Sequence, residues 1–433
     1  MIKQKEIIFA LATPKGKSAL AVFRVSGKNS HKVIRKISSN KKITPKKTNL
    51  TYFCDTKMKP IDKTLTTYFK SPKTYTGEDM VEVSCHGSVA IINKITTTLL
   101  DSGIRHAEPG EFTKRALENN KLDITQVEGL SDLIDAETEK QRQVAFQNLE
   151  GHVSDYSKKL NNKMMKMLAD TEALIDFVDE DLPKNIIRKI KEQNRNIIKE
   201  IEKALSLSKI SKPIKNGFLI TVLGKPNTGK SSFINYISGR DVSIVTNIPG
   251  TTTDSIESQL EIDGYKFRFV DTAGIRKHKN TIEKIGIEKA HKSAIISDLN
   301  LVFLEDLETD LYEKIPNKIF IQSKQDIHKS KNNLKKTSKI SSITGYGIKK
   351  LINRIKKNIL GADLEKIPPF SRERHIKNME KCLKTLKSIN FKKSVDMTAY
   401  DIRTAIRENQ EIYQRFDIEK ILDIIFSDFC IGK

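Results

Sequence analysis

The sequence predicts a multidomain chain in which an α/β P-loop domain is inserted into an all-α helical domain. An apolar run at residues 217–223 (GFLITVL) leads into a glycine-rich loop and then into a segment with helical spacing, the strand, loop and helix order of a phosphate-binding domain. Apolar residues recur every three or four positions before this segment, within residues 122–179, and after it, within residues 376–406. Helices are therefore expected on both sides of the insertion.

Length and composition predict a folded cytoplasmic protein of two or three domains. The chain has 433 residues, of which 37% are hydrophobic and 30% charged. No stretch approaches membrane-spanning length, and the apolar patch at residues 7–12 is too short for a signal-peptide core. The cysteines form no C-x-x-C pair, so we expect neither disulfides nor zinc, and we interpret the first three as small buried residues. They are Cys54, Cys85, Cys382 and Cys430.

The chain is strongly basic. Lysine and arginine number 77 against 54 acidic residues, a formal net charge of +23. Such a charge permits a polyanionic partner such as RNA. Lysine-rich runs such as residues 41–47 and 331–339 are more typical of solvated loops, so the charge alone identifies no partner.

Residues 224–232 (GKPNTGKSS) carry the pattern G-x-x-x-x-G-K-[ST]. The two glycines let backbone N–H groups turn inward around phosphate oxygens, and the helix that follows adds its positive dipole end. Lys230 supplies a charge at the β and γ phosphates, and Ser231 places its hydroxyl on Mg²⁺. A nucleoside triphosphate is expected to contact Asn227, Thr228, Gly229, Lys230, Ser231 and Ser232.

Two later strand-like runs end in polar motifs. Residues 265–270 lead into Asp271, whose carboxylate can reach Mg²⁺ through water, and Gly274 can offer its N–H to the γ-phosphate. Residues 319–322 lead into a motif with Asp326, which can accept two hydrogen bonds from guanine but not from adenine. GTP is therefore expected. The motif residues are Asp271, Thr272, Ala273 and Gly274, then Ser323, Lys324 and Asp326, and finally Ser341 and Ser342, where a further strand ends and a backbone N–H could support the base.

These four elements in this order resemble a translation-factor-class GTPase domain. The guanine motif of that class is usually N-K-x-D, and here Ser323 stands first. Serine has one hydroxyl and cannot brace both the base and the phosphate loop as an amide does. Guanine preference is expected to persist through Asp326, with lower affinity.

Residues 239–254 (GRDVSIVTNIPGTTTD), together with Asn227, resemble the potassium-dependent subgroup of these GTPases. The resemblance implies a K⁺ ion that neutralises charge developing between the β and γ phosphates, as an arginine finger does elsewhere. It places K⁺ at Asn227, Thr246, Ile248 and Thr251, Mg²⁺ at Ser231 and Thr252, and Asn247 in the nucleotide site.

Segments along nearly the whole chain resemble the tRNA-modification GTPase family called MnmE or TrmE. They are ATPKGKSALAVFRVSG, TYTGEDMVEVSCHG, AEPGEFTKRALENNKLDITQVEGLSDLIDAET, the IRKHKNTIEKIGIEKA that follows the D-T-A-G motif, and the terminal FCIGK. The resemblance implies that Glu283 orients the attacking water once two GTPase domains meet. Residue type alone would favour a surface glutamate paired with Lys279 or Lys284, and the position of Glu283 in the motif favours catalysis instead.

The same resemblance implies an α+β N-terminal domain that forms a homodimer and binds 5-formyltetrahydrofolate. Arg24, Glu82, Lys121 and Lys433 would contribute to the folate site, and Cys430 would lie near the substrate as a nucleophile or as a polar contact. With an FAD-dependent MnmG-like partner in a heterotetramer, the chain would modify carbon 5 of the wobble uridine of certain tRNAs. The implied domains are residues 1–120 (folate and dimerisation), 121–215 (helical), 216–364 (GTPase) and 365–433 (helical, ending in FCIGK).

Two other interpretations remain open at this point. A ribosome-assembly GTPase would share the phosphate and potassium loops but would carry an RNA-binding module in place of the TGEDMVEVSCHG segment. A folate- or tRNA-binding scaffold with a decayed GTPase is suggested by Ser323 and by a shortened stretch between residues 304 and 318. Intact Asn227, Lys230, Asp271 and Glu283 argue against decay.

Overall fold

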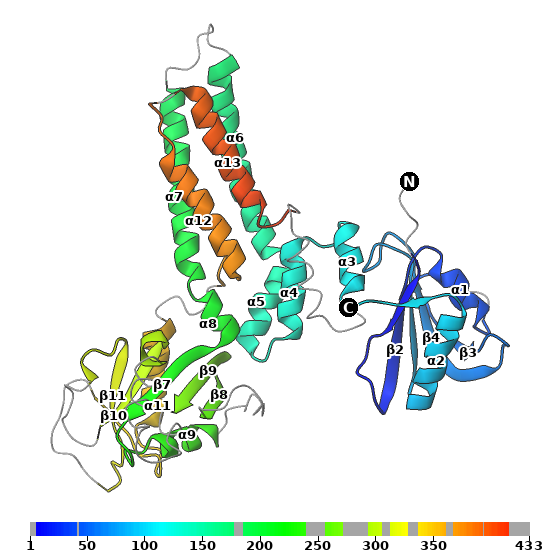
Figure 1. Ribbon diagram of the computed structural model, residues 1–433, viewed down its shortest axis with the longest axis horizontal. Coiled ribbons are helices and arrows are strands. Elements are labelled where there is room, and N and C mark those ends of the chain that lie inside the picture. The colour runs from blue at the N-terminus through cyan, green and yellow to red at the C-terminus, as the bar shows by residue number, and fades with distance from the viewer. Residues whose placement is uncertain are drawn as a thin grey trace, which may run out of the picture. The chain divides into compact units, whose positions relative to one another are not determined.

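The computed structural model describes residues 6–40, 43–176, 185–239, 256–271, 293–304, 312–327, 337–360, 367–392 and 394–414. Contacts divide the chain into two units (Figure 1). The first comprises Met1–Ser131, Leu149–Ser154 and Gln410–Lys433, and the second comprises Asp132–Asn148 and Asp155–Asn409. Each unit combines segments that lie far apart in the sequence, so the units do not correspond to the four predicted domain ranges. Those ranges stay a prediction.

The first unit contains a six-stranded sheet with helices, the α+β arrangement expected of the N-terminal domain. Its strand order is β3-β4-β5-β2-β1-β6, antiparallel except where β1 pairs with β6. The strands are β1 (Ile8–Leu11), β2 (Ser18–Ser26), β3 (Thr48–Cys54), β4 (Pro60–Phe69), β5 (Met80–Gly87) and β6 (Arg105–His106). The helices that begin in this unit and lie mainly in it are α1 (Ser30–Lys36), α2 (Val89–Asp101), α3 (Glu111–Glu118) and α4 (Ile124–Ile134).

The alternation of β2 decides which side chains reach the core of this sheet. Ala21, Phe23 and Val25 are buried, and they pack in one apolar cluster with residues of α1 and α2. Because successive side chains of a strand point to opposite faces, Arg24 lies on the other face. In the register of β2 and β5 it stands directly opposite Glu82.

A network of charged side chains ties α3 to the sheet. Arg115 is 3% exposed and donates to Glu78 Oε2 at 2.9 Å, to Glu111 Oε1 at 2.8 Å and to the carbonyl of Glu6 at 3.0 Å. Arg105 donates to the same Glu111 oxygen at 2.7 Å. Each buried carboxylate therefore has a charged partner, which is what makes its burial tolerable.

The Glu111 carboxyl predicts an acid-sensitive first unit. Burial by itself raises its pKa, but hydrogen bonds from Arg105, the Glu108 N–H and Arg115 outweigh burial and bring the pKa to about 2. The stabilisation is present above the ordinary glutamate pKa of about 4.3 and is lost as the pH falls toward 2. Hydrogen-exchange protection of β2 and α3 in the intact chain, corrected for intrinsic exchange, should fall over that window. Glu111→Gln should flatten the dependence, and an unchanged slope would contradict this assignment.

The second unit contains a helical bundle, in which α12 packs along α7 and Asn194 donates to the Leu386 carbonyl at 3.1 Å (Figure 1). The recurring apolar residues of the sequence form its core, as Met379, Leu386 and Ile402 show by their complete burial. The helices are α5 (Glu139–Leu149), α6 (His152–Asp176), α7 (Ile186–Ser208), α8 (Ser211–Asn216), α12 (Glu373–Ser388) and α13 (Val395–Gln410).

A second six-stranded sheet lies between α8 and α12 in the chain, which confirms the insertion of an α/β domain between helices. Its order is β12-β11-β10-β7-β9-β8, parallel except for the β8–β9 hairpin. The elements are β7 (Phe218–Gly224), α9 (Lys230–Ser238), β8 (Ile256–Ile262), β9 (Tyr265–Asp271), β10 (Leu299–Leu304), β11 (Lys318–Gln322), β12 (Ser338–Lys339) and α11 (Ile348–Leu360).

Three strands expected from the sequence are confirmed in β7, β9 and β11, and a fourth ends earlier than expected. The expected strand through Ser342 stops at Lys339. Ser341 donates its N–H to the Tyr346 carbonyl, and Gly345 donates back to the Ser341 carbonyl, each at 2.9 Å. These bonds turn the chain away from the sheet edge.

The turn of the β8–β9 hairpin is held by α5. The Lys140 N–H donates to the Gly264 carbonyl at 3.0 Å, and Lys266 forms an ion pair with Glu137. Val144 of α5 belongs to the same buried apolar cluster as Phe218 of β7. The sheet and this part of the helical region thus share one core.

The interpretation of three cysteines as small buried residues is confirmed. Cys54, Cys85 and Cys382 are at most 2% exposed and are free thiols. Burial raises the pKa of Cys85 to about 11 and that of Cys382 to about 12, so both are held as unreactive thiols. Among the described residues, no helix is long and apolar enough to cross a membrane.

Candidate nucleotide-binding site

The phosphate loop begins at the end of β7, where Gly224 pairs with Phe303 of β10. Gly224 has φ of 143°, and a Cβ there would stand 2.4 Å from the Phe303 carbonyl oxygen, so only glycine fits. Asn227 has φ of 60° and an exposed side chain, and Gly229 has φ of 90°. These left-handed residues curl the loop before α9 begins at Lys230.

Lys230 is buried within that loop. It is 4% exposed, and its ammonium group donates to the carbonyls of Gly224 and Lys225 at 2.9 and 2.7 Å. Ser231 and Ser232 follow on the first turn of α9 with exposed side chains. A fixed cation, a helix N-terminus and exposed hydroxyls form an anion-binding arrangement, and this fits a nucleotide phosphate with Mg²⁺ at Ser231.

The predicted guanine motif lies at the carboxyl end of β11, with Asp326 fixed by a neighbouring loop. The fully buried Ser341 donates its hydroxyl to Asp326 Oδ1 at 2.6 Å and accepts the N–H groups of Ile343 and Thr344 at 3.3 and 3.2 Å. The Ser341 N–H is engaged with Tyr346, so support of the base by a backbone N–H stays a prediction for Ser342. Sequence reasoning missed the role of the Ser341 side chain.

Ser323 joins this motif to the phosphate loop. Its hydroxyl donates to the carbonyl of Thr228, a residue that is 2% exposed and whose own hydroxyl donates to the Lys225 carbonyl at 2.8 Å. Lys324 follows with φ of 58°. The structure thus brings Ser323, Asp326 and the phosphate loop to one edge of the sheet.

Several predicted site residues lie outside the described part of the chain. They are Thr246, Asn247, Ile248, Thr251, Thr252, Thr272, Ala273, Gly274, Glu283, Cys430 and Lys433. Asp271 is described only as the last residue of β9.

Of the predicted folate residues that are described, the structure pairs Arg24 with Glu82 and places Lys121 beside Gly77. Arg24 donates to Glu82 Oε1 through Nε at 3.0 Å and through a terminal nitrogen at 2.9 Å, with 24% and 31% of the two side chains exposed. The Arg24 guanidinium lies 5.7 Å from the centre of the Tyr75 ring. Lys121 borders Gly77, since a Cβ on that glycine would stand 3.2 Å from Lys121 Cε. Tyr75, within the TYTGED stretch, was not singled out from the sequence.

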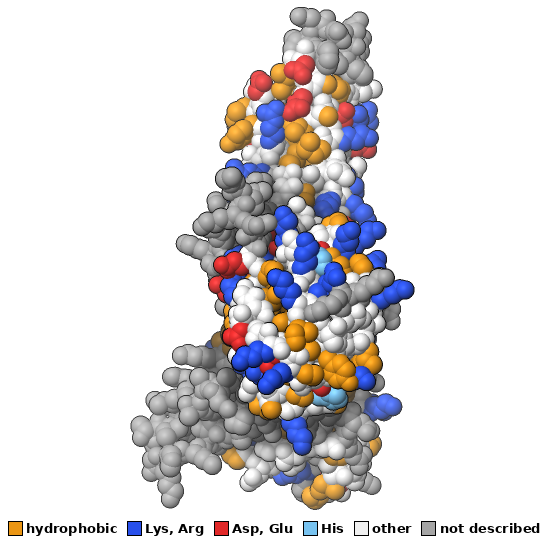
Figure 2. All heavy atoms as spheres, turned by 90° about the vertical axis from the view of Figure 1, so that its right-hand side faces the viewer, with side chains coloured by type: hydrophobic (Ala, Val, Ile, Leu, Met, Phe, Trp, Pro, Cys, Tyr) orange, Lys and Arg blue, Asp and Glu red, His pale blue; other side chains and the backbone are white. Residues whose placement is uncertain are grey.

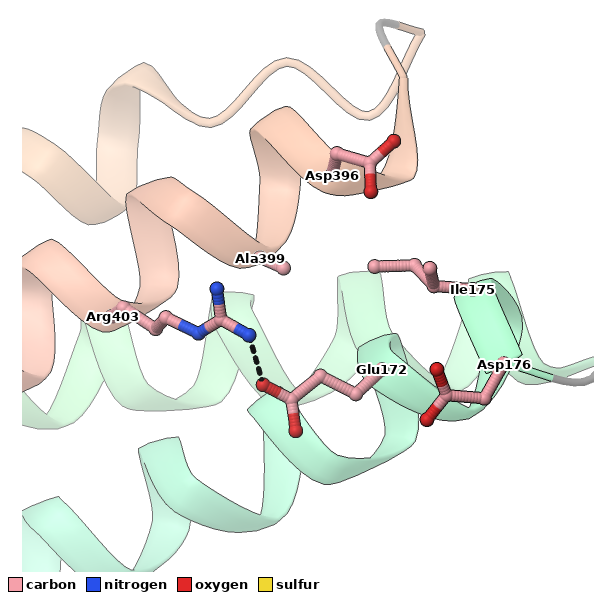
Figure 3. Close-up of a pocket in the computed structure, with 6 residues that line it drawn as sticks. All are labelled: Glu172, Ile175, Asp176, Asp396, Ala399 and Arg403. Atoms are coloured by element: carbon pink, nitrogen blue, oxygen red, sulfur yellow. Dashed lines mark hydrogen bonds and ion pairs between the residues drawn. The ribbon is translucent and has the colours of Figure 1, made fainter.

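A separate cavity of about 370 Å³ lies between the end of α6 and the start of α13 (Figure 3). Arg403 and Glu172 point toward one another and form an ion pair of 2.6 Å, while Asp176 and Asp396 flank the opening. None of the predicted site residues lines it. Its charged side chains belong to the exposed surfaces of two neighbouring helices.

The basic charge does not mark a binding face by itself. Figure 2 shows one face on which lysine and arginine side chains are spread among hydrophobic and neutral ones. In the described residues, no group of three or more histidine, cysteine or acidic side chains is placed to hold a metal ion.

Comparison with known proteins decides the family. Residues 7–121 match the family described as the GTP-binding protein TrmE N-terminus, and residues 124–430 match the MnmE helical domain. This chain belongs to the MnmE family. Relatives in it are called tRNA modification GTPase MnmE. That of Pelagibacter ubique is 38% identical over 98% of this chain and 100% of its own, that of Aquifex aeolicus 37% over 99% and 100%, and that of Orientia tsutsugamushi 35% over 98% and 99%.

Proposed function

We propose that this member of the MnmE family is a GTPase that acts in tRNA modification. The observation that carries the proposal is the match over nearly the full length of relatives named for that activity, supported by a closed phosphate loop at Lys230 and a fixed Asp326. GTP would lie with its phosphates over the loop at Lys230 and its base at Asp326. The Asp326 carboxylate accepts hydrogen bonds from guanine that adenine cannot supply.

The catalytic part of the proposal rests on the chemistry of phosphoryl transfer. Lys230 is already held at the start of α9, where positive charge meets the β and γ phosphates. Ser231 and Thr252 would hold Mg²⁺, and Asn227, Thr246, Ile248 and Thr251 would hold K⁺. Either ion supplies positive charge against the charge that develops in the transition state. Glu283 would position the attacking water.

The tRNA part of the proposal concerns the first unit. Arg24 and Glu82 present a guanidinium and a carboxylate side by side on the sheet, beside the Tyr75 ring, a donor and acceptor set that fits the heterocycle of 5-formyltetrahydrofolate. Lys121 and Lys433 would add charge for its carboxylates. We propose that a homodimer of this chain, joined to an FAD-dependent MnmG-like protein, modifies the wobble uridine of tRNA, with Cys430 near the reacting base.

The rival interpretations fare less well. A ribosome-assembly GTPase would not match the TrmE N-terminus over residues 7–121. A decayed GTPase would not be expected to keep a buried Lys230 in a closed phosphate loop and a fixed Asp326.

Steady-state GTP hydrolysis by the purified chain, in potassium and in sodium buffer of equal ionic strength, tests the proposal. We expect potassium to accelerate turnover on the order of 10²-fold, the value of one electrostatic contact to the transition state. Glu283→Ala should lower turnover about 10²- to 10⁴-fold while GTP still binds, because it removes the group that positions water.

Glu288→Ala, which removes another carboxylate from the same segment, is the matched control and should keep its turnover. Equal slow rates in both salts, unaffected by Glu283→Ala, would overturn the catalytic assignment. They would favour a scaffold with a degenerate GTPase.

A further inference from the structure

The hydroxyl of Ser323 is committed to the phosphate loop. Serine has a single O–H proton, and Ser323 donates it to the Thr228 carbonyl. The hydroxyl is also closely packed there, since a Cβ on Gly229 would stand 2.9 Å from Ser323 Oγ. Toward a bound base, Ser323 therefore presents only acceptor lone pairs.

The edge of guanine that would face Ser323 also carries only acceptors. A base bound through N1–H and the 2-amino group to Asp326 turns its other edge, with N7 and O6, away from that carboxylate. Ser323 stands between the Asp326 loop and the phosphate loop, where this edge must lie for the ribose and phosphates to reach Lys230. Two acceptors facing each other cannot form a hydrogen bond.

The donors of Ser341 do not replace the one that Ser323 lacks. The Ser341 hydroxyl proton is given to Asp326 Oδ1, and the Ser341 N–H to the Tyr346 carbonyl. Lys324 is half-buried beside Ser323 with φ of 58°, which turns the chain at that residue. The recognition of guanine thus rests on the Asp326 carboxylate at N1 and the 2-amino group, together with the predicted support of the base by the Ser342 N–H.

We infer that this chain reads guanine without a hydrogen bond from Ser323 to N7, so that a guanine nucleotide in which N7 is replaced by C–H binds as tightly as the natural one. This inference rests on the proposed function, since it concerns the same nucleotide site. An amide at position 323 would act differently, because its NH₂ group has two protons, one for the Thr228 carbonyl and one for N7.

Calorimetric titration with GDP and 7-deaza-GDP in the presence of Mg²⁺ tests the inference without interference from hydrolysis. For the unmodified chain the two dissociation constants should agree within about 2-fold, less than the value of one net hydrogen bond. Ser323→Asn should bind GDP more tightly than 7-deaza-GDP by about 2- to 12-fold, the range expected for one new hydrogen bond.

Ser323→Ala is the matched control. It breaks the bond to Thr228 and should weaken both nucleotides by the same factor, which separates bracing of the loop from reading of the base. If 7-deaza-GDP binds the unmodified chain 5-fold or more weakly than GDP, N7 is read and the inference is wrong, whatever the variants do. If no guanine nucleotide binds at all, the proposed function fails, and the inference fails with it.

Discussion

The Arg115→Met variant is expected to lose about 3 kcal/mol of stability in the first unit, at the lower end of the range for removing one partner of a buried ion pair. Arg115 is 3% exposed, and its guanidinium contacts Glu78, Glu111 and the carbonyl of Glu6. Methionine fills a similar volume but leaves Glu78 without its cation. Because Glu111 keeps Arg105, the loss stays near the lower end of the range.

Hydrogen exchange of β2, β5 and α3 in the intact chain measures this loss as a drop in protection. Arg142→Met in α5 is the control, because Arg142 and Glu139 pair at 2.7 Å with 52% and 50% of their side chains exposed. Exposed pairs add little to stability, so no measurable change is expected there. Equal effects of the two substitutions would show that burial does not govern the Arg115 network.

The Lys230→Ala variant is expected to lower GTP affinity about 30- to 4,000-fold, which corresponds to about 2–5 kcal/mol for truncating one partner of a buried charge contact. Lys230 is buried at the start of α9, and its ammonium is held by two loop carbonyls beside the proposed phosphate position. Alanine removes this charge, so only the positive dipole end of α9 would remain to attract the phosphates.

The neighbouring Lys225, exposed in the same loop, provides the control. Lys225→Ala carries the same change of net charge, so it reports the long-range contribution that salt screens. Titration of GTP at two salt concentrations should show a small, salt-sensitive loss for Lys225→Ala and a large one at both salts for Lys230→Ala. Similar losses for the two would contradict a direct phosphate contact by Lys230.

Much of the inserted domain could be predicted because its signals are local. The strands β7 and β11 are short, mainly apolar runs and β9 alternates apolar and polar residues, each with glycine or a polar motif at its end, and the loop before Lys230 carries a fixed pattern. The end of β12 was placed too late, because the bonds between Ser341, Gly345 and Tyr346 that end it leave no periodic signal.

Contacts between distant segments could not be predicted in the same way. The bond from Ser323 to Thr228 joins residues 95 positions apart, and Arg115 meets Glu78 across 37 positions. The sequence showed that serine replaces the usual asparagine at position 323. It did not show whether the serine hydroxyl would contact the base or the phosphate loop. Tyr75 beside Arg24 was missed for the same reason, since a ring on a loop has no spacing that marks its neighbour.

The contact between α5 and the β8–β9 turn has a consequence for dissecting this chain. Val144 fills part of the same core as Ile214 and Phe218, and Lys140 and Glu137 hold Gly264 and Lys266 from outside. A fragment that begins at residue 216 would lack Val144 and Ile214, which belong to its hydrophobic core. The part of the sheet that they cover would then be exposed to water. The smallest piece of the second unit with an intact sheet and phosphate loop therefore includes α5 and α8, although more than 60 residues of chain separate them.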